Sequence, residues 1–265
     1  MYWLKRTLLF VVRYFYALFS SIYLFVIGFM FPKNRLLVNQ ISAHFGLPVV
    51  RPGIGQVKLS KLLEAQPPVQ LIEAEGEDGN VRLSELVALS LFARAFQPRA
   101  IFEIGTFDGR TTMNLALNSP ADAKVYTLDL PKDCVSSTVL PTCRGDQAYL
   151  NINVTGARYR SKDERSFPEK RKIVQLYGDS ATFDFSPYFN GMDLAFVDGA
   201  HSYDYVRNDS RIALKMLRGG KGVILWHDYG IWGGVTKALN ELQARNPQFH
   251  LHRIQDTTLI CLILR

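Results

Sequence analysis

The segment from Ile101 to Thr111, with the sequence IFEIGTFDGRT, constrains the fold of this chain most strongly. An apolar strand runs directly into a turn that contains Gly105 and Gly109, and a helix is expected to follow. Glycines let the backbone turn tightly and approach a ligand, and the start of a helix offers free N–H groups. The pattern therefore predicts a bound cofactor at a strand–turn–helix junction.

The glycine spacing distinguishes this turn from a dinucleotide-binding turn. The order is Glu-x-Gly-x-x-x-Gly from Glu103, whereas the turn that holds a dinucleotide pyrophosphate is Gly-x-Gly-x-x-Gly. A second apolar strand, 124–128, leads to Asp129, about 20 residues after Gly109, where an acid accepts hydrogen bonds from ribose hydroxyls. A nucleoside-containing cofactor is expected, and a dehydrogenase is disfavoured.

Strands and helices alternate after this turn, and a helix precedes it. Further strands are predicted at 174–177, 194–197 and 222–226, helices at 82–96, 205–217 and 234–244, and a closing hairpin at 249–254 and 259–264. This order predicts an α/β fold with a doubly wound sheet. Residues 131–172 exceed an ordinary connection, so part of them is expected to be an insertion that shapes the substrate pocket.

Two acid and histidine pairs follow neighbouring strands. Asp198 and His201 come after one strand, and His227 and Asp228 come after the next. Ligands of open α/β sheets bind at these strand ends. The four side chains could bind a divalent cation, abstract a proton from a hydroxyl group, or do both. The alternative is that the histidines only cap strand ends.

Across residues 80–265 these ordered motifs resemble the class I S-adenosylmethionine-dependent methyltransferases. The resemblance implies a Rossmann-like sheet of seven strands with the last strand antiparallel, and S-adenosylmethionine as cofactor. It also implies the following cofactor-binding residues: Glu103, Gly105, Thr106, Asp108, Gly109, Asp129, Asp179, Ser180 and Asp198.

The histidine motifs look more closely like those of cation-dependent O-methyltransferases that act on sugar hydroxyls. That resemblance implies catalytic roles for Asp198 and for His201, the general base, and a metal site at Asp198, His227 and Asp228. The group has a carboxylate where this chain has His227. Because Mg²⁺ prefers oxygen ligands, the imidazole should weaken Mg²⁺ or favour Mn²⁺. A metal-free alternative keeps His201 as base, with Asp198 orienting it.

Charge and composition exclude some functions. The chain has 265 residues, 48% of them apolar, which suits one large α/β core. Residues 1–35 contain five basic residues and no acidic residue, so they account for five units of the net charge of +7. The rest of the chain is therefore nearly neutral. Nucleic acid is therefore not an expected partner. The local exception is the basic stretch 158–172, interpreted either as a solvated loop or as a contact for an anionic substrate. The three cysteines show no CxxC pair, which suggests a reducing compartment.

The amino terminus has the pattern of a membrane segment. Residues 14–31 form an uncharged, mostly apolar run of about 18 residues, close to the minimum for crossing a bilayer. A cleaved signal peptide is disfavoured, and a packed or dimerising helix stays open, so the chain could form a homo-oligomer. We expect an anchor at 1–35, a linker or cap at 36–79 and the catalytic domain at 80–265. Since the cofactor is made in the cytosol, the resemblance implies a membrane-associated domain facing the cytoplasm.

These observations favour a membrane-tethered O-methyltransferase that acts on a small hydroxylated acceptor such as a sugar or glycolipid. The alternative from another class is a non-catalytic membrane-tethered protein that binds the cofactor and recruits partners. The Asp198 and His201 pair argues against that alternative.

Overall fold

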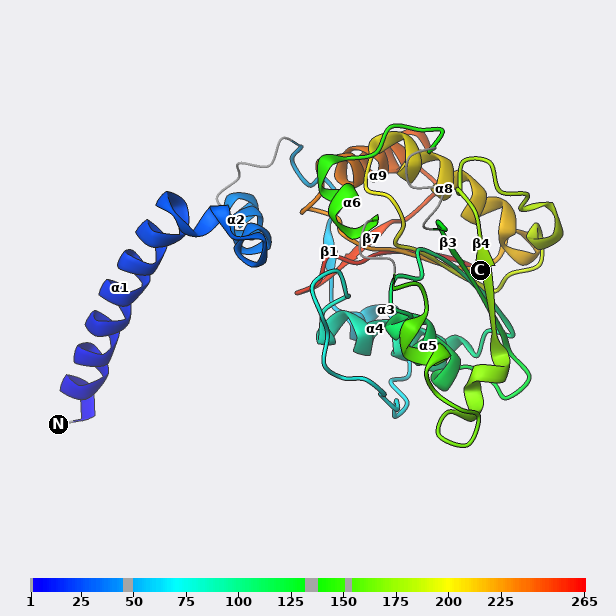
Figure 1. The fold of residues 1–265 in the computed structure, drawn as a ribbon, viewed down its shortest axis with the longest axis horizontal. Coiled ribbons are helices and arrows are strands. Elements are labelled where there is room, and N and C mark those ends of the chain that lie inside the picture. The colour runs from blue at the N-terminus through cyan, green and yellow to red at the C-terminus, as the bar shows by residue number, and fades with distance from the viewer. Residues whose placement is uncertain (1, 45–49, 132–137, 151–153) are drawn as a thin grey trace. The chain divides into compact units, whose positions relative to one another are not determined.

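The computed structural model describes residues 2–44, 50–131, 138–150 and 154–265. The chain divides into two compact units, Met1–Val49 and Val50–Arg265, which are described separately (Figure 1). The predicted boundaries after residues 35 and 79 remain predictions. Cys134 lies outside the described residues.

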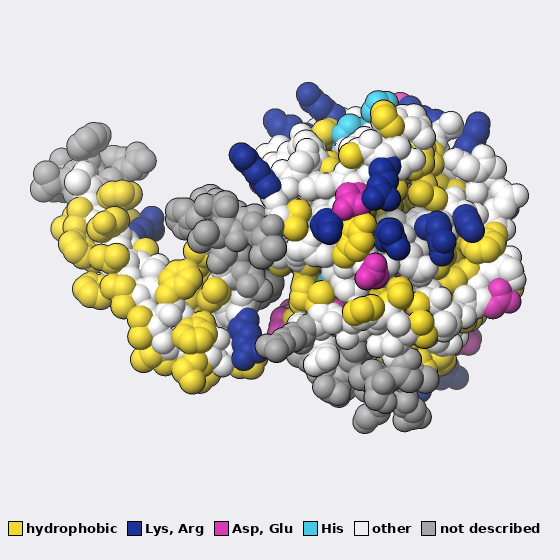
Figure 2. All heavy atoms as spheres, turned by 90° about the horizontal axis from the view of Figure 1, so that it is seen from above, with side chains coloured by type: hydrophobic (Ala, Val, Ile, Leu, Met, Phe, Trp, Pro, Cys, Tyr) yellow, Lys and Arg dark blue, Asp and Glu magenta, His cyan; other side chains and the backbone are white. Residues whose placement is uncertain are grey.

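The first unit is a long helix followed by a shorter one: α1 (Tyr2–Val26), the 3₁₀ turn η1 (Gly28–Met30) and α2 (Pro32–His44). Within the described residues, Thr7–Val26 is the one helical stretch long and apolar enough to cross a membrane. Residues 7–23 are all exposed, and hydrophobic side chains dominate this helix in Figure 2. A helix that is apolar on all sides lacks the single buried stripe of a surface helix.

The second unit is built on one sheet of eight strands. They are β1 (Gln56–Val57), β2 (Ala100–Ile104), β3 (Lys124–Asp129), β4 (Ile173–Tyr177), β5 (Leu194–Val197), β6 (Gly222–Trp226), β7 (His252–Ile254) and β8 (Ile260–Leu264). Their order is β1-β7-β8-β6-β5-β2-β3-β4. All neighbouring pairs are parallel except those of β8, which is antiparallel to both β6 and β7.

The predicted α/β doubly wound fold is confirmed, but the sheet has eight strands where seven were expected. The additional strand, β1, lies in the stretch that was predicted as a linker or cap. It pairs with β7 through Gln56 and Val57, which lie opposite Arg253 and Ile254. A two-residue edge strand has too little alternation to be recognised from its sequence.

Helices cover both faces of the sheet (Figure 1). They are α3 (Leu59–Leu62), α4 (Leu83–Phe96), α5 (Arg110–Asn118), α6 (Arg144–Leu150), α7 (Ala157–Arg160), α8 (Tyr203–Met216) and α9 (Gly233–Arg245), with 3₁₀ turns η3 (Pro168–Lys172), η4 (Ser186–Tyr188) and η5 (Arg218–Gly220). Leu194 and Phe196 pack in the cluster that contains α4 and α5, whereas Ala195 and Val197 pack with α8 and α9. This alternation is the two-residue period of a strand buried on both faces.

The parallel strands β3, β2, β5 and β6 are neighbours, so their carboxyl ends share one edge of the sheet. That edge carries Asp129, the glycine turn, Asp198 and the pair His227 and Asp228. The insertion predicted at 131–172 contributes α6, α7 and η3.

Candidate active site

The glycine turn is packed against the carboxyl end of β5. Gly105 has φ +98°, and a Cβ there would lie 2.0 Å from the carbonyl oxygen of Asp198. Gly109, at φ +88°, begins α5, and a Cβ there would lie 2.5 Å from the Tyr159 ring. Both positions exclude a side chain for reasons of space and of backbone conformation. The turn predicted to hold the cofactor therefore touches the strand end predicted to hold the catalytic acid.

Glu103, at the end of β2, is fully buried. Its Oε2 accepts hydrogen bonds from Thr127 Oγ1 at 2.6 Å and from Thr112 Oγ1, while its Oε1 has no partner among the described residues. Burial raises the pKa of Glu103 to about 8. A buried polar atom without a partner is unusual, and a ligand that donates a hydrogen bond would satisfy it.

The side chains of Asp108 and Thr106 form hydrogen bonds within and around the glycine turn. Asp108 Oδ1 accepts from the Arg110 backbone N–H and from Asn80 Nδ2, both at 3.0 Å, and its Oδ2 accepts from Arg158 Nε at 2.7 Å. Thr106 Oγ1 lies 2.7 Å from Thr127 Oγ1. The structure thus gives both side chains protein partners, and a direct contact with the cofactor stays a prediction.

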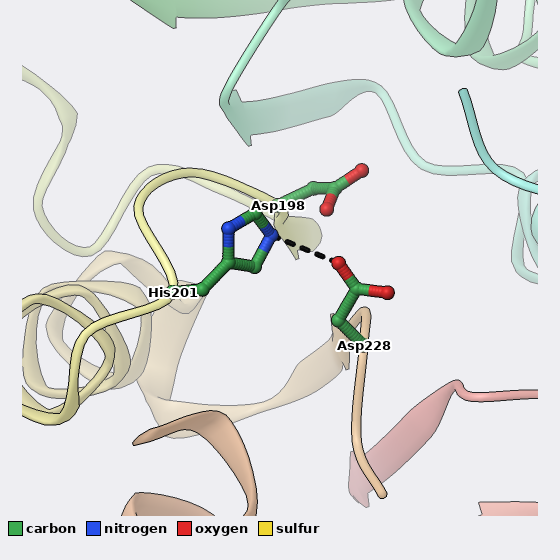
Figure 3. Close-up of side chains that lie close together, drawn as sticks. All are labelled: Asp198, His201 and Asp228. Carbon is green, nitrogen blue, oxygen red and sulfur yellow. Dashed lines mark ion pairs between the residues drawn. The ribbon is translucent and has the colours of Figure 1, made fainter. Parts of the chain in front are cut away.

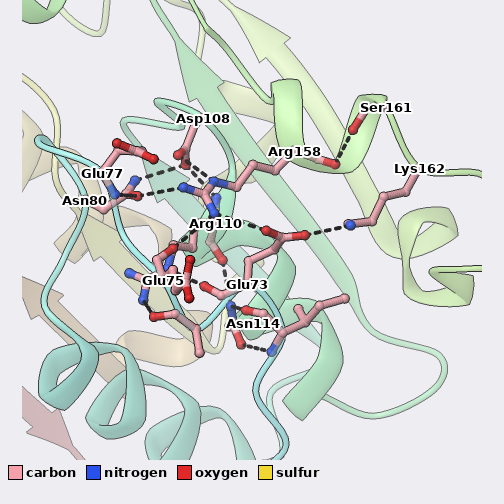
Figure 4. Close-up of polar contacts among 12 residues, drawn as sticks. Glu73, Glu75, Glu77, Asn80, Asp108, Arg110, Asn114, Arg158, Ser161 and Lys162 are labelled. Carbon is pink, nitrogen blue, oxygen red and sulfur yellow. Dashed lines mark hydrogen bonds and ion pairs between the residues drawn. The ribbon is translucent and has the colours of Figure 1, made fainter.

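A polar network holds residues 73–81 against this turn (Figure 4). The buried Arg110 guanidinium donates to the carbonyl oxygens of Glu73, Ala74 and Val81 at 2.6, 2.5 and 2.8 Å. Each carbonyl is thereby satisfied without water.

Two basic residues of the stretch 158–172 join this network. Arg158 Nη1 and Lys162 Nζ form ion pairs with Glu73 at 3.2 and 2.6 Å. These cations thus have partners within the protein, unlike the freely solvated loop that the sequence suggested.

Asp129 ends β3, beside the glycine turn in the sheet. Its Oδ2 accepts from Thr155 Oγ1 at 2.6 Å, and its Oδ1 accepts from the backbone N–H of Leu130 at 3.1 Å. Burial raises the pKa of Asp129 to about 6. It lies where a ribose-binding acid is expected, although its ribose contact stays a prediction.

Asp179 is surrounded by protein donors. Both of its oxygens accept from Tyr205 OH, at 2.9 and 2.8 Å, and the backbone N–H groups of Ala181 and Val139 add bonds at 2.8 and 2.9 Å. The carbonyl oxygen of the next residue, Ser180, accepts from Asn208 Nδ2 at 3.0 Å. These contacts fix the turn after β4, and the adenine contact of Asp179 and Ser180 remains a prediction.

Asp198, His201 and Asp228 converge at the ends of β5 and β6 (Figure 3). One ligand atom from each lies within 4.8 Å of the others. His201 Nε2 lies 2.8 Å from Asp228 Oδ2, and its Nδ1 lies 2.6 Å from Asp146 Oδ1. Asp228 adopts φ +65°, a conformation rare outside glycine that is typical of strained functional sites.

Residues 102–229, which contain this whole cluster, match the family model of a methyltransferase domain. The chain carries a methyltransferase domain. The recognition made from the sequence motifs is therefore confirmed.

Two solved structures are similar to this methyltransferase domain, and the first of them shares its fold. Cofactor-bound Rv0187 from MTB is 19% identical with a TM-score of 0.51, and the match covers 72% of this chain and 84% of that one. The O-methyltransferase TomG from Streptomyces achromogenes, solved in complex with SAM, is 20% identical with a TM-score of 0.49, covering 89% and 100%. No curated protein matches the sequence.

His227, predicted as a metal ligand of the methyltransferase domain, is held between two carboxylates. Its Nδ1 lies 3.0 Å from Asp198 Oδ1 and its Nε2 lies 3.0 Å from Glu85 Oε2. Burial opposes the charged ring, but Asp198 and Asp228 outweigh it and raise the pKa of His227 well above its usual value. An imidazolium has no free lone pair for a metal. Both ring nitrogens of His227 face carboxylates, and its ligation of a metal stays a prediction.

His201 lies in a similar environment. Burial opposes the charge, but the carboxylates of Asp146 and Asp228 raise the pKa of His201 to about 10. The two positive rings in turn hold the pKa of Asp228 far below its usual range, against the effect of burial. A general base must be neutral before it accepts a proton, so this role requires that Asp228 be engaged elsewhere.

The donors fit a divalent cation. Asp198 and Asp228 supply the oxygen atoms that Mg²⁺ and Mn²⁺ prefer. His201 Nε2 is buried and lacks a hydrogen bond of good geometry among the described residues, despite its 2.8 Å ion-pair distance to Asp228.

Sequence reasoning missed two carboxylates of this site. Glu85 Oε2 contacts His227 Nε2. Glu85 Oε1 accepts hydrogen bonds from the backbone N–H and the Oγ1 of Thr258, both at 2.8 Å. Burial would raise the pKa of Glu85, but His227 and these donors lower it to about 2. It lies near the start of the predicted helix 82–96, where no motif marked it. Asp146 lies in the insertion, where no motif marked it.

Proposed function

We propose that this domain transfers the methyl group of S-adenosylmethionine to a hydroxyl group of a small acceptor. The observation that carries the proposal is the contact between Gly105 and Asp198, which brings the cofactor turn against the acid and histidine cluster. The family match supports methyl transfer. Rv0187, which shares the fold, was solved with a cofactor bound.

In this proposal the cofactor lies along the carboxyl edge of the sheet. Its methionine part faces the turn between Glu103 and Gly109, where the unpaired oxygen of Glu103 receives a donor. Asp129 accepts the ribose hydroxyls, and Asp179 and Ser180 border the adenine. The sulfonium methyl then points toward Asp198.

The reaction needs a deprotonated hydroxyl group held in line with that methyl. His201 Nε2 accepts the hydroxyl proton while the oxygen lone pair forms the new bond to the methyl carbon. The carbon–sulfur bond breaks, and its electron pair returns to sulfur, which leaves neutral S-adenosylhomocysteine. The protein contributes positioning and proton transfer rather than covalent catalysis.

Asp198 and Asp228 would hold a divalent cation in this domain. When bound, such an ion would lower the pKa of the acceptor hydroxyl and draw Asp228 away from His201. His227 would then position Asp198 through its 3.0 Å contact.

We further propose that α1 anchors the domain to a membrane, with the domain on the cytoplasmic side and a sugar or glycolipid as acceptor. The exposed apolar surface of Thr7–Val26 supports the anchor. Flotation of the full chain with phosphatidylcholine vesicles tests it, and recovery in the unbound fraction would contradict it.

The test of the catalytic proposal is a screen of sugar, glycolipid and phenolic acceptors with methyl-labelled S-adenosylmethionine. His201→Ala should lower transfer by about 10²–10⁴-fold, the usual contribution of a general base, with unchanged affinity for S-adenosylhomocysteine. A variant that retained full activity would remove His201 as the base.

A further inference from the structure

Asp146 reaches His201 from a part of the chain 55 residues away. It lies on α6 with its carboxylate buried. Its Oδ1 lies 2.6 Å from His201 Nδ1 and accepts from the His201 backbone N–H at 3.3 Å. Its Oδ2 accepts from the backbone N–H of Cys143 at 2.9 Å. The carboxylate is therefore fixed by its own helix start and holds the histidine by both ring and backbone.

Trp232 fixes the face of the same ring. Its indole stacks on His201 with centroids 4.4 Å apart and an interplanar angle of 13°. Stacking of this kind restricts rotation of the imidazole about χ2. Asp146 on one edge and Trp232 on one face leave the Nε2 edge directed at Asp228.

Gly145 allows α6 to approach this closely. A Cβ at Gly145 would lie 2.1 Å from Trp232 Cη2 and 2.7 Å from its Cζ3, which is shorter than real contacts permit. Gly145 thus contacts the Trp232 ring, and the adjacent Asp146 contacts the His201 ring that is stacked on it. A helix that only covered the surface would require neither contact.

We propose that Asp146 is a positioning residue for His201, and that α6 completes the catalytic site when Gly145 packs on Trp232. A carboxylate at Nδ1 keeps a proton on that nitrogen, so the lone pair of the neutral ring lies on Nε2. An amide at this position donates to Nδ1 as readily as it accepts, and it thereby favours the other tautomer. This inference rests on the proposed base role of His201.

The test uses ¹⁵N-histidine NMR of the full chain in detergent, with the His201 signals assigned by their loss in His201→Ala. The wild type should show a strongly deshielded Nδ1–H proton from the short contact with Asp146. Asp146→Asn should lose that signal, and Gly145→Ala should lose it as well because α6 is pushed off the indole.

Asp78→Asn is the matched control, since Asp78 contacts Tyr149 OH on the same helix at 3.4 Å without touching His201. It should leave the His201 signals unchanged. Affinity for S-adenosylhomocysteine should stay within about twofold in Asp146→Asn, because Asp146 contacts no predicted cofactor residue.

Three results would overturn the proposal. An unchanged His201 signal in Asp146→Asn would show that the carboxylate does not hold the ring, and an unchanged signal in Gly145→Ala would show that α6 packing is not needed. Loss of cofactor affinity in Asp146→Asn would assign the residue a structural role. A wild type with the deshielded signal but no cofactor binding would instead contradict the proposed function and leave the Asp146 contact standing.

Discussion

At the scale of single residues, the site combines acids whose environments shift their pKa in opposite directions. Burial raises the pKa of Glu103 to about 8 and that of the half-buried Asp129 to about 6. Glu85 and Asp228 face positive histidines, which lowers theirs. Such divergence is typical of functional sites, because burial and charged neighbours are concentrated there.

Glu103 gives a pH-dependent stability that can be measured. Its folded pKa exceeds the ordinary value of 4.5, so its contribution is complete below pH 4.5 and is lost as the pH rises to about 8. The free energy of unfolding of the wild type should fall, relative to Glu103→Gln, by roughly 1.4 kcal/mol per pH unit across that window.

Urea unfolding of both proteins between pH 5 and pH 8, without cofactor, checks this difference. Asp122→Asn, at a well exposed carboxyl group, serves as control and should run parallel to the wild type. A constant difference between wild type and Glu103→Gln would show that Glu103 ionises normally.

At the scale of elements, sequence reasoning succeeded where the hydrophobic period was long and clear. The strand at 222–226 matches β6. The helix at 82–96 differs from α4 by one residue, and the hairpin of β7 and β8 pairs as predicted. Each of these segments buries one regular face, so the spacing of its apolar residues shows whether it forms a helix or a strand.

The elements that were missed are short and depend on distant contacts. β1 has two residues, and α6 has no apolar period in its sequence RGDQAYL. Asp146 contacts His201, and Gly145 packs on Trp232, through contacts between segments that are distant in the sequence. The residues after β5 and β6 could be found because parallel neighbouring strands place their ends together.

The hydroxyl group of Tyr229 is one of the groups that hold the segment before β1. Tyr229 OH accepts from the backbone N–H groups of Gly53 and Ile54 at 2.8 and 2.9 Å. Because the Gly53 N–H also donates to Asn240 Oδ1 at 3.1 Å, Tyr229→Phe leaves the Ile54 N–H without an acceptor and should cost about 1–3 kcal/mol of unfolding free energy. Amide exchange at Ile54 should accelerate at the same time.

Tyr188→Phe is the control for that substitution, because Tyr188 OH has no hydrogen-bond acceptor among the described residues. Its unfolding free energy should change by less than about 0.5 kcal/mol. Equal effects of the two substitutions would show that the hydroxyl of Tyr229 does not hold β1.

At the scale of the whole molecule, one chain joins an exposed apolar helix to a methyltransferase domain. The domain has its own sheet and core, and its proposed chemistry lies along a single edge of that sheet. The proposed anchor would keep the domain at a membrane, which suits an acceptor attached to a lipid.

The most direct test of the account is calorimetric titration of S-adenosylhomocysteine into the full chain in detergent, with and without Mg²⁺ or Mn²⁺. We expect micromolar binding of S-adenosylhomocysteine, and no binding of NAD under the same conditions. Absence of S-adenosylhomocysteine binding under every condition would contradict the assignment of this site to methyl transfer.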